Sequence, residues 1–298
     1  MSVHLFTHPD CLRHETGPGH PEQPARLAAI LAMAGQAPGV EVVEARAASA
    51  TSLLTVHPST HLALLESTSA DGGGAISLDT VMSSESWRAV LGATGAALAA
   101  LEHAHAGRGN AFAAVRPPGH HALAARAMGF CLVNNVVVAA RAGQAIGRHR
   151  VLIVDWDVHH GNGTQALVEH DVSVRYVSLH QHPWYPGTGM AHERGVGNVF
   201  NVPRGPGLPP ERYVDDLWQA VVAATDGWTP DLVLLSAGFD AMAGDPLGGF
   251  TLRAEDYADL TLRLRTRLPA APIVALLEGG YIPARLAEGV KACLGALA

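Results

Sequence analysis

The sequence predicts an α/β protein built around a parallel sheet. Short apolar runs rich in β-branched residues recur between longer segments of helical periodicity, and this alternation is typical of α/β folds. The runs lack strict polar alternation, as expected for strands covered by helices on both faces. Of the 298 residues, 48% are hydrophobic and only 16% are charged, so the chain can bury a large core. We therefore expect one domain spanning residues 1–298.

The elements follow from these patterns along the chain. The expected strands are Val3–Phe6, Val40–Val43, Ala111–Val115, Val151–Val154, Val174–Leu179, Leu232–Ser236 and Ile273–Leu277. The expected helices are Pro24–Ala34, Ser84–His105, Leu132–Ile146, Pro210–Thr225, Arg253–Leu268 and Pro283–Leu297. Asp71–Ala75, with three glycines, is expected to be a mobile surface loop.

Polar, glycine-rich segments adjoin the ends of the expected strands. They are Pro117–Gly129, Gly161–Gly163, His180–Gly197, Gly238–Gly249 and Gly279–Tyr281. Ligands of open parallel sheets bind in the loops beyond the carboxyl ends of the strands. We therefore expect the functional residues in these segments.

Composition argues against several classes of protein. Twenty Lys and Arg against 27 Asp and Glu leave a net charge of −7, which disfavours electrostatic binding of nucleic acid. No uncharged apolar stretch reaches the ~18 residues of a membrane span, and the N-terminal sequence lacks the pattern of a signal peptide. Three widely spaced cysteines support neither a disulfide framework nor a cysteine zinc module. We expect a cytoplasmic protein without nucleic-acid or membrane partners.

A candidate metal site follows the run Val151–Val154. Asp155, Asp157 and His159 are spaced two apart, so that an extended chain would point them the same way. Asp240 follows another expected strand and would supply a third ligand to a zinc ion, which accepts both O and N donors. The alternatives are a merely polar strand exit and an aspartate that caps a loop.

Two further groups have catalytic potential. His120 and His121 follow the run Ala111–Val115, and adjacent histidines at a strand exit suit general acid and base catalysis. Glu278–Tyr281 places a Gly-Gly turn and a tyrosine after Ile273–Leu277, and the hydroxyl would donate to an oxyanion. The alternatives are a surface histidine pair and a structural tyrosine.

Taken together, these segments resemble the histone deacetylase superfamily of zinc-dependent amidohydrolases. The similarity is to the class II-like branch that includes bacterial deacetylases and acetylpolyamine amidohydrolases. It implies an arginase-like fold, a parallel sheet of about eight strands between helix layers. The ordered motifs are HPDCLRHETGPGHPEQPAR, RPPGHH, GFCLVNN, DWDVHHGNGTQ, VSLHQHPWYPGTG, SAGFDAMAGDPLGG and EGGY, and they cover nearly the whole chain.

The resemblance assigns catalytic or metal-binding roles to individual residues of the motifs. Asp157, His159 and Asp240 would bind zinc. His120 and His121 would form the proton-transfer pair, with His121 as the working base and acid. Asp155 would hold His120, and Asn162 would hold His121, where class I relatives carry an aspartate; this change should leave His121 less basic. Tyr281 would polarise the acyl carbonyl together with zinc.

Other positions are assigned by the same resemblance. Gly129 and Phe130 would line the acyl-lysine tunnel, and Arg26 would be structural, near an internal channel. Potassium would bind to Asp155, to Ser178 and to backbone carbonyls that include that of Leu179. The remaining carbonyls would be those of Asp157 and His159.

The implied activity is removal of acetyl or similar acyl groups from acetyl-lysine-like amides. Leu247 stands where relatives that prefer acetylpolyamines carry a glutamate, so we expect a preference for acetyl-lysine. Asp79 is the alternative acid for the ammonium group of a polyamine. The alternatives are an acetylpolyamine deacetylase, a dimanganese ureohydrolase of the arginase type and a catalytically weak sensor of acetylated ligands. The substrate would be an acylated peptide, protein or small amine, and an oligomer is possible.

Overall fold

An eight-stranded sheet forms the centre of the computed structural model, which describes residues 2–298. The strand order is β2-β1-β5-β10-β9-β6-β7-β8, and each neighbouring pair is parallel. The parallel α/β sheet of about eight strands is therefore confirmed. The strands are β1 (Val3–Thr7), β2 (Val40–Glu44), β5 (Ala111–Ala113), β6 (Val151–Asp155), β7 (Val174–Gln181), β8 (Val199–Arg204), β9 (Leu232–Ala237) and β10 (Ile273–Leu277).

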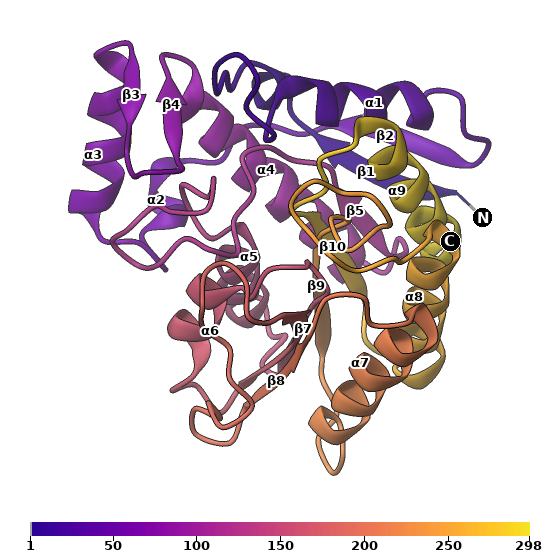
Figure 1. Cartoon of the computed structure of the whole chain (residues 1–298). Coiled ribbons are helices and arrows are strands. Elements are labelled where there is room, and N and C mark those ends of the chain that lie inside the picture. The colour runs from indigo at the N-terminus through magenta and orange to yellow at the C-terminus, as the bar shows by residue number, and fades with distance from the viewer. Residues whose placement is uncertain (1) are drawn as a thin grey trace.

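Helices cover both faces of the sheet (Figure 1). One layer contains α1 (Pro24–Ala34), α7 (Pro210–Ala224), α8 (Ala254–Arg267) and α9 (Pro283–Leu297). The other contains α4 (Ser86–His105), α5 (Asn135–Ala145) and α6 (Asn162–Val168). The short helices η1 (Pro9–Leu12) and α2 (Ala50–Leu53), together with α3 (Ser59–Ala70), lie in the N-terminal third. No helix within residues 2–298 is long and apolar enough to cross a membrane.

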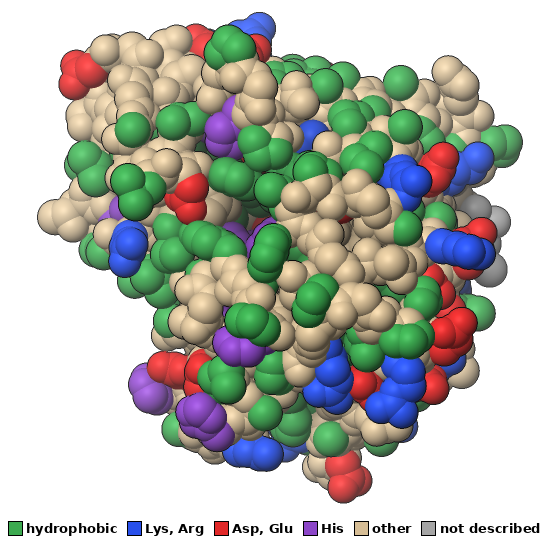
Figure 2. Space-filling model, in the orientation of Figure 1, with side chains coloured by type: hydrophobic (Ala, Val, Ile, Leu, Met, Phe, Trp, Pro, Cys, Tyr) green, Lys and Arg blue, Asp and Glu red, His purple; other side chains and the backbone are tan. Residues whose placement is uncertain are grey.

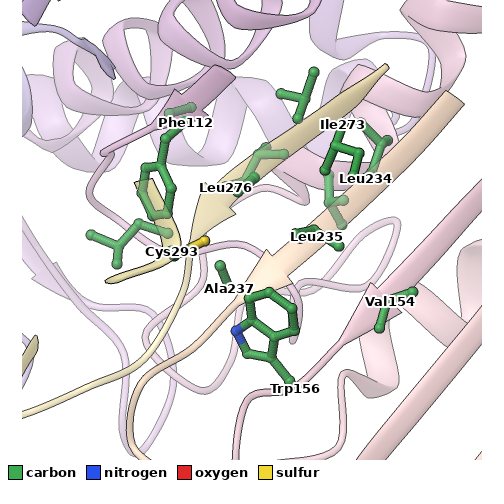
Figure 3. Close-up of a cluster of buried hydrophobic side chains, with 14 of the residues drawn as sticks. Phe112, Val154, Trp156, Leu234, Leu235, Ala237, Ile273, Leu276 and Cys293 are labelled. Atoms are coloured by element: carbon green, nitrogen blue, oxygen red, sulfur yellow. The ribbon is translucent and has the colours of Figure 1, made fainter. Parts of the chain in front are cut away.

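The hydrophobic core lies on both sides of the central strands (Figure 3). Every residue of β5, β6, β9 and β10 is buried. Phe112, Leu234, Leu276 and Trp156 are each completely inaccessible to solvent. This two-sided burial explains why the strand sequences are apolar except near their carboxyl ends, where Asp155 and Ser236 lie. It also fixes the carboxyl ends of these strands as a rigid platform for the loops that follow them.

Two parts of the sheet structure were not predicted. β8 contains Asn201 and Pro203, which weaken its sequence signal, and it is an edge strand, where proline is tolerated. The prediction of a surface loop at Asp71–Ala75 was wrong, because β3 (Gly73–Ala75) pairs with β4 (Val81–Ser83) in an antiparallel hairpin. Gly73 has a φ of +100°, and a Cβ there would lie 2.3 Å from the Met82 carbonyl oxygen, so glycine is needed for this pairing.

The start of α5 also differs from the expected helix Leu132–Ile146. The helix begins at Asn135, because the Asn134 side chain accepts a hydrogen bond from the Val137 N–H at 3.1 Å and caps it. His61 donates to the Leu132 carbonyl from Nε2 at 2.9 Å, which keeps that residue outside the helix. The preceding residues therefore remain free to shape the loop beyond β5. The short helices α2 and α6, and the longer α3, were likewise not predicted.

Candidate active site

A cavity of about 230 Å³ opens at the carboxyl edge of the sheet. Figure 2 shows hydrophobic side chains gathered around a hollow in the middle of this face, with histidine inside it. The cavity receives residues from the loops after five strands of the sheet, as expected for a parallel sheet, and one residue, Asp79, from the turn between β3 and β4. It is lined by Asp79, His121, Gly129, Phe130, His159, Trp184, Tyr185, Leu247 and Tyr281.

Three candidate metal ligands converge at the bottom of this cavity. His159 Nδ1 lies 3.0 Å from Asp157 Oδ1 and 3.1 Å from Asp240 Oδ2. The chain leaves the strand after Asp155 and bends through residues 157–159, so the two-residue spacing does not act through an extended backbone as we expected. The bend nevertheless places Asp157 and His159 together, while the Asp155 carboxylate points toward His120 and Tyr176.

Backbone groups hold the two carboxylates in place. The Val158 N–H donates to Asp240 Oδ1 at 2.8 Å, and the Gly279 N–H donates to Asp157 Oδ2 at 2.8 Å. A Cβ on Gly279 would lie 2.1 Å from Asp240 Oδ2, and one on Gly238 would lie 2.1 Å from Asp157 Oδ2. Both glycines are therefore required for the carboxylates to approach each other.

The donor set fits a divalent metal ion. Bonds of about 2.0–2.2 Å to a tetrahedral ion place neighbouring donor atoms roughly 3–3.5 Å apart. The two distances from His159 Nδ1 to the carboxylates match this spacing, and the three donor atoms all lie within 4.8 Å of one another. Burial, together with the negative charge of Asp157, raises the pKa of Asp240 to about 7. The buried carboxylates of Asp157 and Asp240 repel each other at this short separation, and a bound dication would relieve that repulsion.

The two adjacent histidines have different partners. His120 Nδ1 donates to Asp155 Oδ2 at 3.1 Å, and His121 Nδ1 donates to Asn162 Oδ1 at 2.8 Å. Burial opposes protonation of His120, but Asp157 and Asp155 outweigh it and raise its pKa. Burial and the neighbouring His120 lower the pKa of His121. The imidazole that lines the cavity is thus the neutral member of the pair.

Tyr281 lines the cavity beside the candidate metal ligands, on the turn after β10. Burial and the nearby Asp240 raise its pKa, so its hydroxyl keeps the proton needed for donation. The Arg26 guanidinium lies 5.0 Å from the centre of the Tyr281 ring, and its Nε donates to the Gly280 carbonyl at 2.6 Å. Arg26 therefore supports the turn that carries Tyr281.

One wall of the cavity is a tight turn at Gly129 and Phe130. Both residues have positive φ, +58° and +67°, which is unusual for phenylalanine. A Cβ on Gly129 would lie 2.3 Å from the His121 ring. Asp79 Oδ1 accepts from the Gly129 N–H at 3.1 Å and Thr80 Oγ1 accepts from the Phe130 N–H at 3.0 Å, and these bonds hold the turn.

Three aromatic residues of the site were not identified from the sequence. Trp184 donates from Nε1 to the Leu247 carbonyl at 2.7 Å, closing one side of the rim. The Tyr185 ring meets the His121 ring edge-on, with centroids 5.1 Å apart. The Tyr176 hydroxyl donates to Asp155 Oδ2 at 2.9 Å. Trp184 and Tyr185 lie in the segment His180–Gly197 beyond a strand end and in the motif VSLHQHPWYPGTG, but neither signal assigned them a role.

Three of the residues expected to hold potassium lie next to one another on β6 and β7, and the other two, Asp157 and His159, follow β6. Asp155 pairs in register with Ser178, and Leu179 follows. The Ser178 hydroxyl lies 2.9 Å from His180 Nδ1, and the Asp155 carboxylate already accepts from His120 and Tyr176. The potassium site stays a prediction.

This arrangement is suited to hydrolysis of a slender substrate. An apolar channel ends at a cluster of candidate metal ligands, flanked by a neutral imidazole on one side and a phenol on the other. Such a layout holds a reacting carbonyl, a proton acceptor and an oxyanion donor together, out of bulk water.

Comparisons with known proteins agree with this chemistry. Residues 20–297 match the histone deacetylase domain family. The chain is 42% identical to histone deacetylase 15 of Arabidopsis thaliana, covering 93% of this chain and 53% of that protein. It is 36% identical to the histone deacetylase-like amidohydrolase of Pseudomonas aeruginosa, covering 91% of this chain and 79% of that one. The crystal structure of the HDA15 HD domain superposes with a TM-score of 0.94 at 39% identity, covering 99% of this chain and 90% of that one.

The chain is therefore a hydrolase that acts on amides. It belongs to the histone deacetylase family and has the arginase/deacetylase fold. This membership confirms the resemblance drawn from the motifs, and favours it over the dimanganese ureohydrolase and the sensor.

Proposed function

We propose that the protein removes acetyl or similar short acyl groups from acetyl-lysine-like amides, with one zinc ion held by Asp157, His159 and Asp240. The observation that carries the proposal is the narrow apolar cavity whose inner end meets these three ligands, His121 and Tyr281. A lysine stem has the right slender, apolar shape to pass Phe130.

The chain's own residues perform the proton transfers. Zinc, when bound, polarises the acyl carbonyl and lowers the pKa of the attacking water. His121, neutral and fixed by Asn162, takes a proton from that water and then returns a proton to the leaving amine nitrogen. Tyr281 donates its hydroxyl hydrogen bond to the developing oxyanion.

His120 has a supporting role in this scheme. Paired with Asp155 and facing the carboxylate of Asp157, it is stabilised as the cation and keeps the neighbouring His121 neutral.

A potassium ion bound beside Asp155, with Ser178 and the Leu179 carbonyl, would change the electrostatic potential at the Asp155 carboxylate. Titrating potassium into sodium-equilibrated enzyme should change turnover. An unchanged rate would count against a functional potassium site beside Asp155.

Leu247 supports the preference for acetyl-lysine over acetylpolyamines. It lines the mouth of the cavity, where it offers packing to methylene groups and no partner to a substrate ammonium. A charge-assisted hydrogen bond is worth about 1.5–3 kcal/mol, so a carboxylate placed there should change specificity about ten- to a hundredfold.

The test compares acetyl-lysine peptides with N8-acetylspermidine, by release of acetate. Leu247→Glu should move the kcat/KM ratio toward the polyamine, whereas Leu247→Gln, of the same shape without the charge, should not. A wild-type enzyme that already favours the polyamine, or a ratio that Leu247→Glu leaves unmoved, contradicts the assignment.

Asp79 favours acetylpolyamine hydrolysis as the second candidate function, because its carboxylate also lines the mouth. Burial opposes its ionisation, but hydrogen bonds from Ser77 and Thr80 outweigh that and lower its pKa. Its Oδ1 already accepts from Ser77, Thr80 and Gly129, which limits its use for a substrate cation. If polyamines are the substrates, Asp79→Asn should depress their kcat/KM far more than that of acetyl-lysine peptides.

A further inference from the structure

Glu278 is a buried carboxylate that the reaction scheme does not use. It is 1% exposed and lies just beyond the end of β10. Its Oε2 accepts from the Gly119 N–H at 2.7 Å and from the His120 N–H at 3.2 Å. The Ser236 hydroxyl donates to its Oε1 at 3.1 Å. This one side chain thus connects the segments at the ends of three adjacent strands, β5, β10 and β9.

The two N–H groups that it accepts have a special position. Pro117 and Pro118 carry no N–H, so Gly119 and His120 provide the first donors of the turn that leads to His121. Gly119 is packed so tightly that a Cβ would lie 2.7 Å from the Asn135 backbone nitrogen. Buried N–H groups that lose their acceptor are costly, so the Glu278 carboxylate determines where this turn can lie.

The same residue is also held at its own backbone. The Glu278 N–H donates to the Ala237 carbonyl at 3.1 Å, and Arg26 donates to the Glu278 carbonyl at 2.5 Å. Three residues later the chain presents Tyr281 to the cavity. Glu278 therefore links the turn that carries His121 to the turn that carries Tyr281.

We propose that Glu278 is a positioning residue: by accepting the Gly119 and His120 N–H bonds, it holds His121 in register with Tyr281 across the reacting carbonyl. The inference rests on the proposed function for the roles of His121 and Tyr281. This positioning requires a side chain long enough to reach the Gly119 and His120 N–H groups and an oxygen that accepts their hydrogen bonds. It does not require a negative charge.

Other roles for Glu278 fit the geometry less well. His120, Cys131 and Glu278 also come close enough to one another to suggest a metal site. Oε2, however, is already engaged by two N–H groups, and His120 Nδ1 faces Asp155. Burial raises the pKa of Glu278 to about 7, and in either protonation state an oxygen remains to accept the N–H bonds.

Two substitutions separate reach from charge. Glu278→Gln keeps the length and an acceptor oxygen, and its NH₂ can donate to Ser236. Glu278→Asp keeps the carboxylate and shortens its reach toward Gly119. We expect kcat of the glutamine variant to stay within about threefold of wild type and kcat of the aspartate variant to fall at least tenfold, with KM and zinc content unchanged in both. Ser236→Ala, which removes only the contact to Oε1, is the matched control and should have near wild-type kcat.

Amide hydrogen exchange of residues 119–122 gives a reading that needs no turnover. Exchange there should be at least tenfold faster in Glu278→Asp than in wild type, and unchanged in Glu278→Gln. An aspartate variant with wild-type exchange and kcat, or a glutamine variant as impaired as the aspartate one, overturns the proposal. If wild type hydrolyses no acylated amide, the proposed function fails, while the exchange contrast still decides whether Glu278 positions the turn.

Discussion

Replacing Asn162 by aspartate is expected to raise the pKa of His121 and move the acid limb of the pH profile upward. The Asn162 Oδ1 atom accepts from His121 Nδ1 at 2.8 Å, and the imidazole is 3% exposed, so a charge placed there is poorly screened by solvent. In the wild type, burial and the neighbouring His120 lower the pKa of His121. The aspartate would oppose both causes.

The size of the shift follows from Coulomb's law. Two unit charges about 4 Å apart in a medium of effective dielectric constant about 20 attract by roughly 4 kcal/mol. The Asn162 carbonyl already supplies part of this stabilisation, and opposite charges at such distances shift pKa values by about 1–3 units. We expect an upward shift of about 1–2 units. Because only neutral His121 acts as the base, activity would then be lost at a higher pH on acidification.

The assay is kcat/KM against pH for the same acetylated substrate. Asn162→Ala is the control, since it removes the orienting acceptor without adding charge; it should lower kcat without moving the acid limb upward. His120, His159 and Asp157 also face His121 and are unchanged in both variants. An acid limb that stays in place in Asn162→Asp, at intact zinc content and melting temperature, would refute the assignment of His121 as the base.

Three further predictions concern the metal and the oxyanion. Tyr281→Phe should lower kcat about 10²–10³-fold with zinc content and melting temperature unchanged; wild-type turnover in this variant would remove the tyrosine from the mechanism. Chelation should abolish activity and lower the melting temperature, because Asp157 and Asp240 then repel each other, and zinc should restore both; a melting temperature that chelation leaves unchanged argues against the site. Gly279→Ala should reduce zinc occupancy, because its Cβ would lie 2.1 Å from Asp240 Oδ2, whereas Gly295→Ala, with nothing within 4 Å of its Cβ, should bind zinc normally.

The local sequence determined the class of fold and the segments that carry chemistry. Runs such as residues 232–235 are apolar throughout because both faces of a central strand are buried, and that pattern is visible without knowing the partner strands. The polar segments after those runs could be identified as candidate site segments for the same reason. β8 escaped prediction because an edge strand interrupted by Pro203 carries little of this signal.

The tertiary structure decided which of these residues meet. Asp240 lies 81 residues beyond His159, and only the pairing of β6 with β9 brings their side chains within 3.1 Å. The choice of Glu278 as the acceptor for Gly119 and His120 depends in the same way on β10 lying beside β5. Strand order and the satisfaction of buried N–H groups are set by packing over the whole chain, so the patterns within single segments do not contain them.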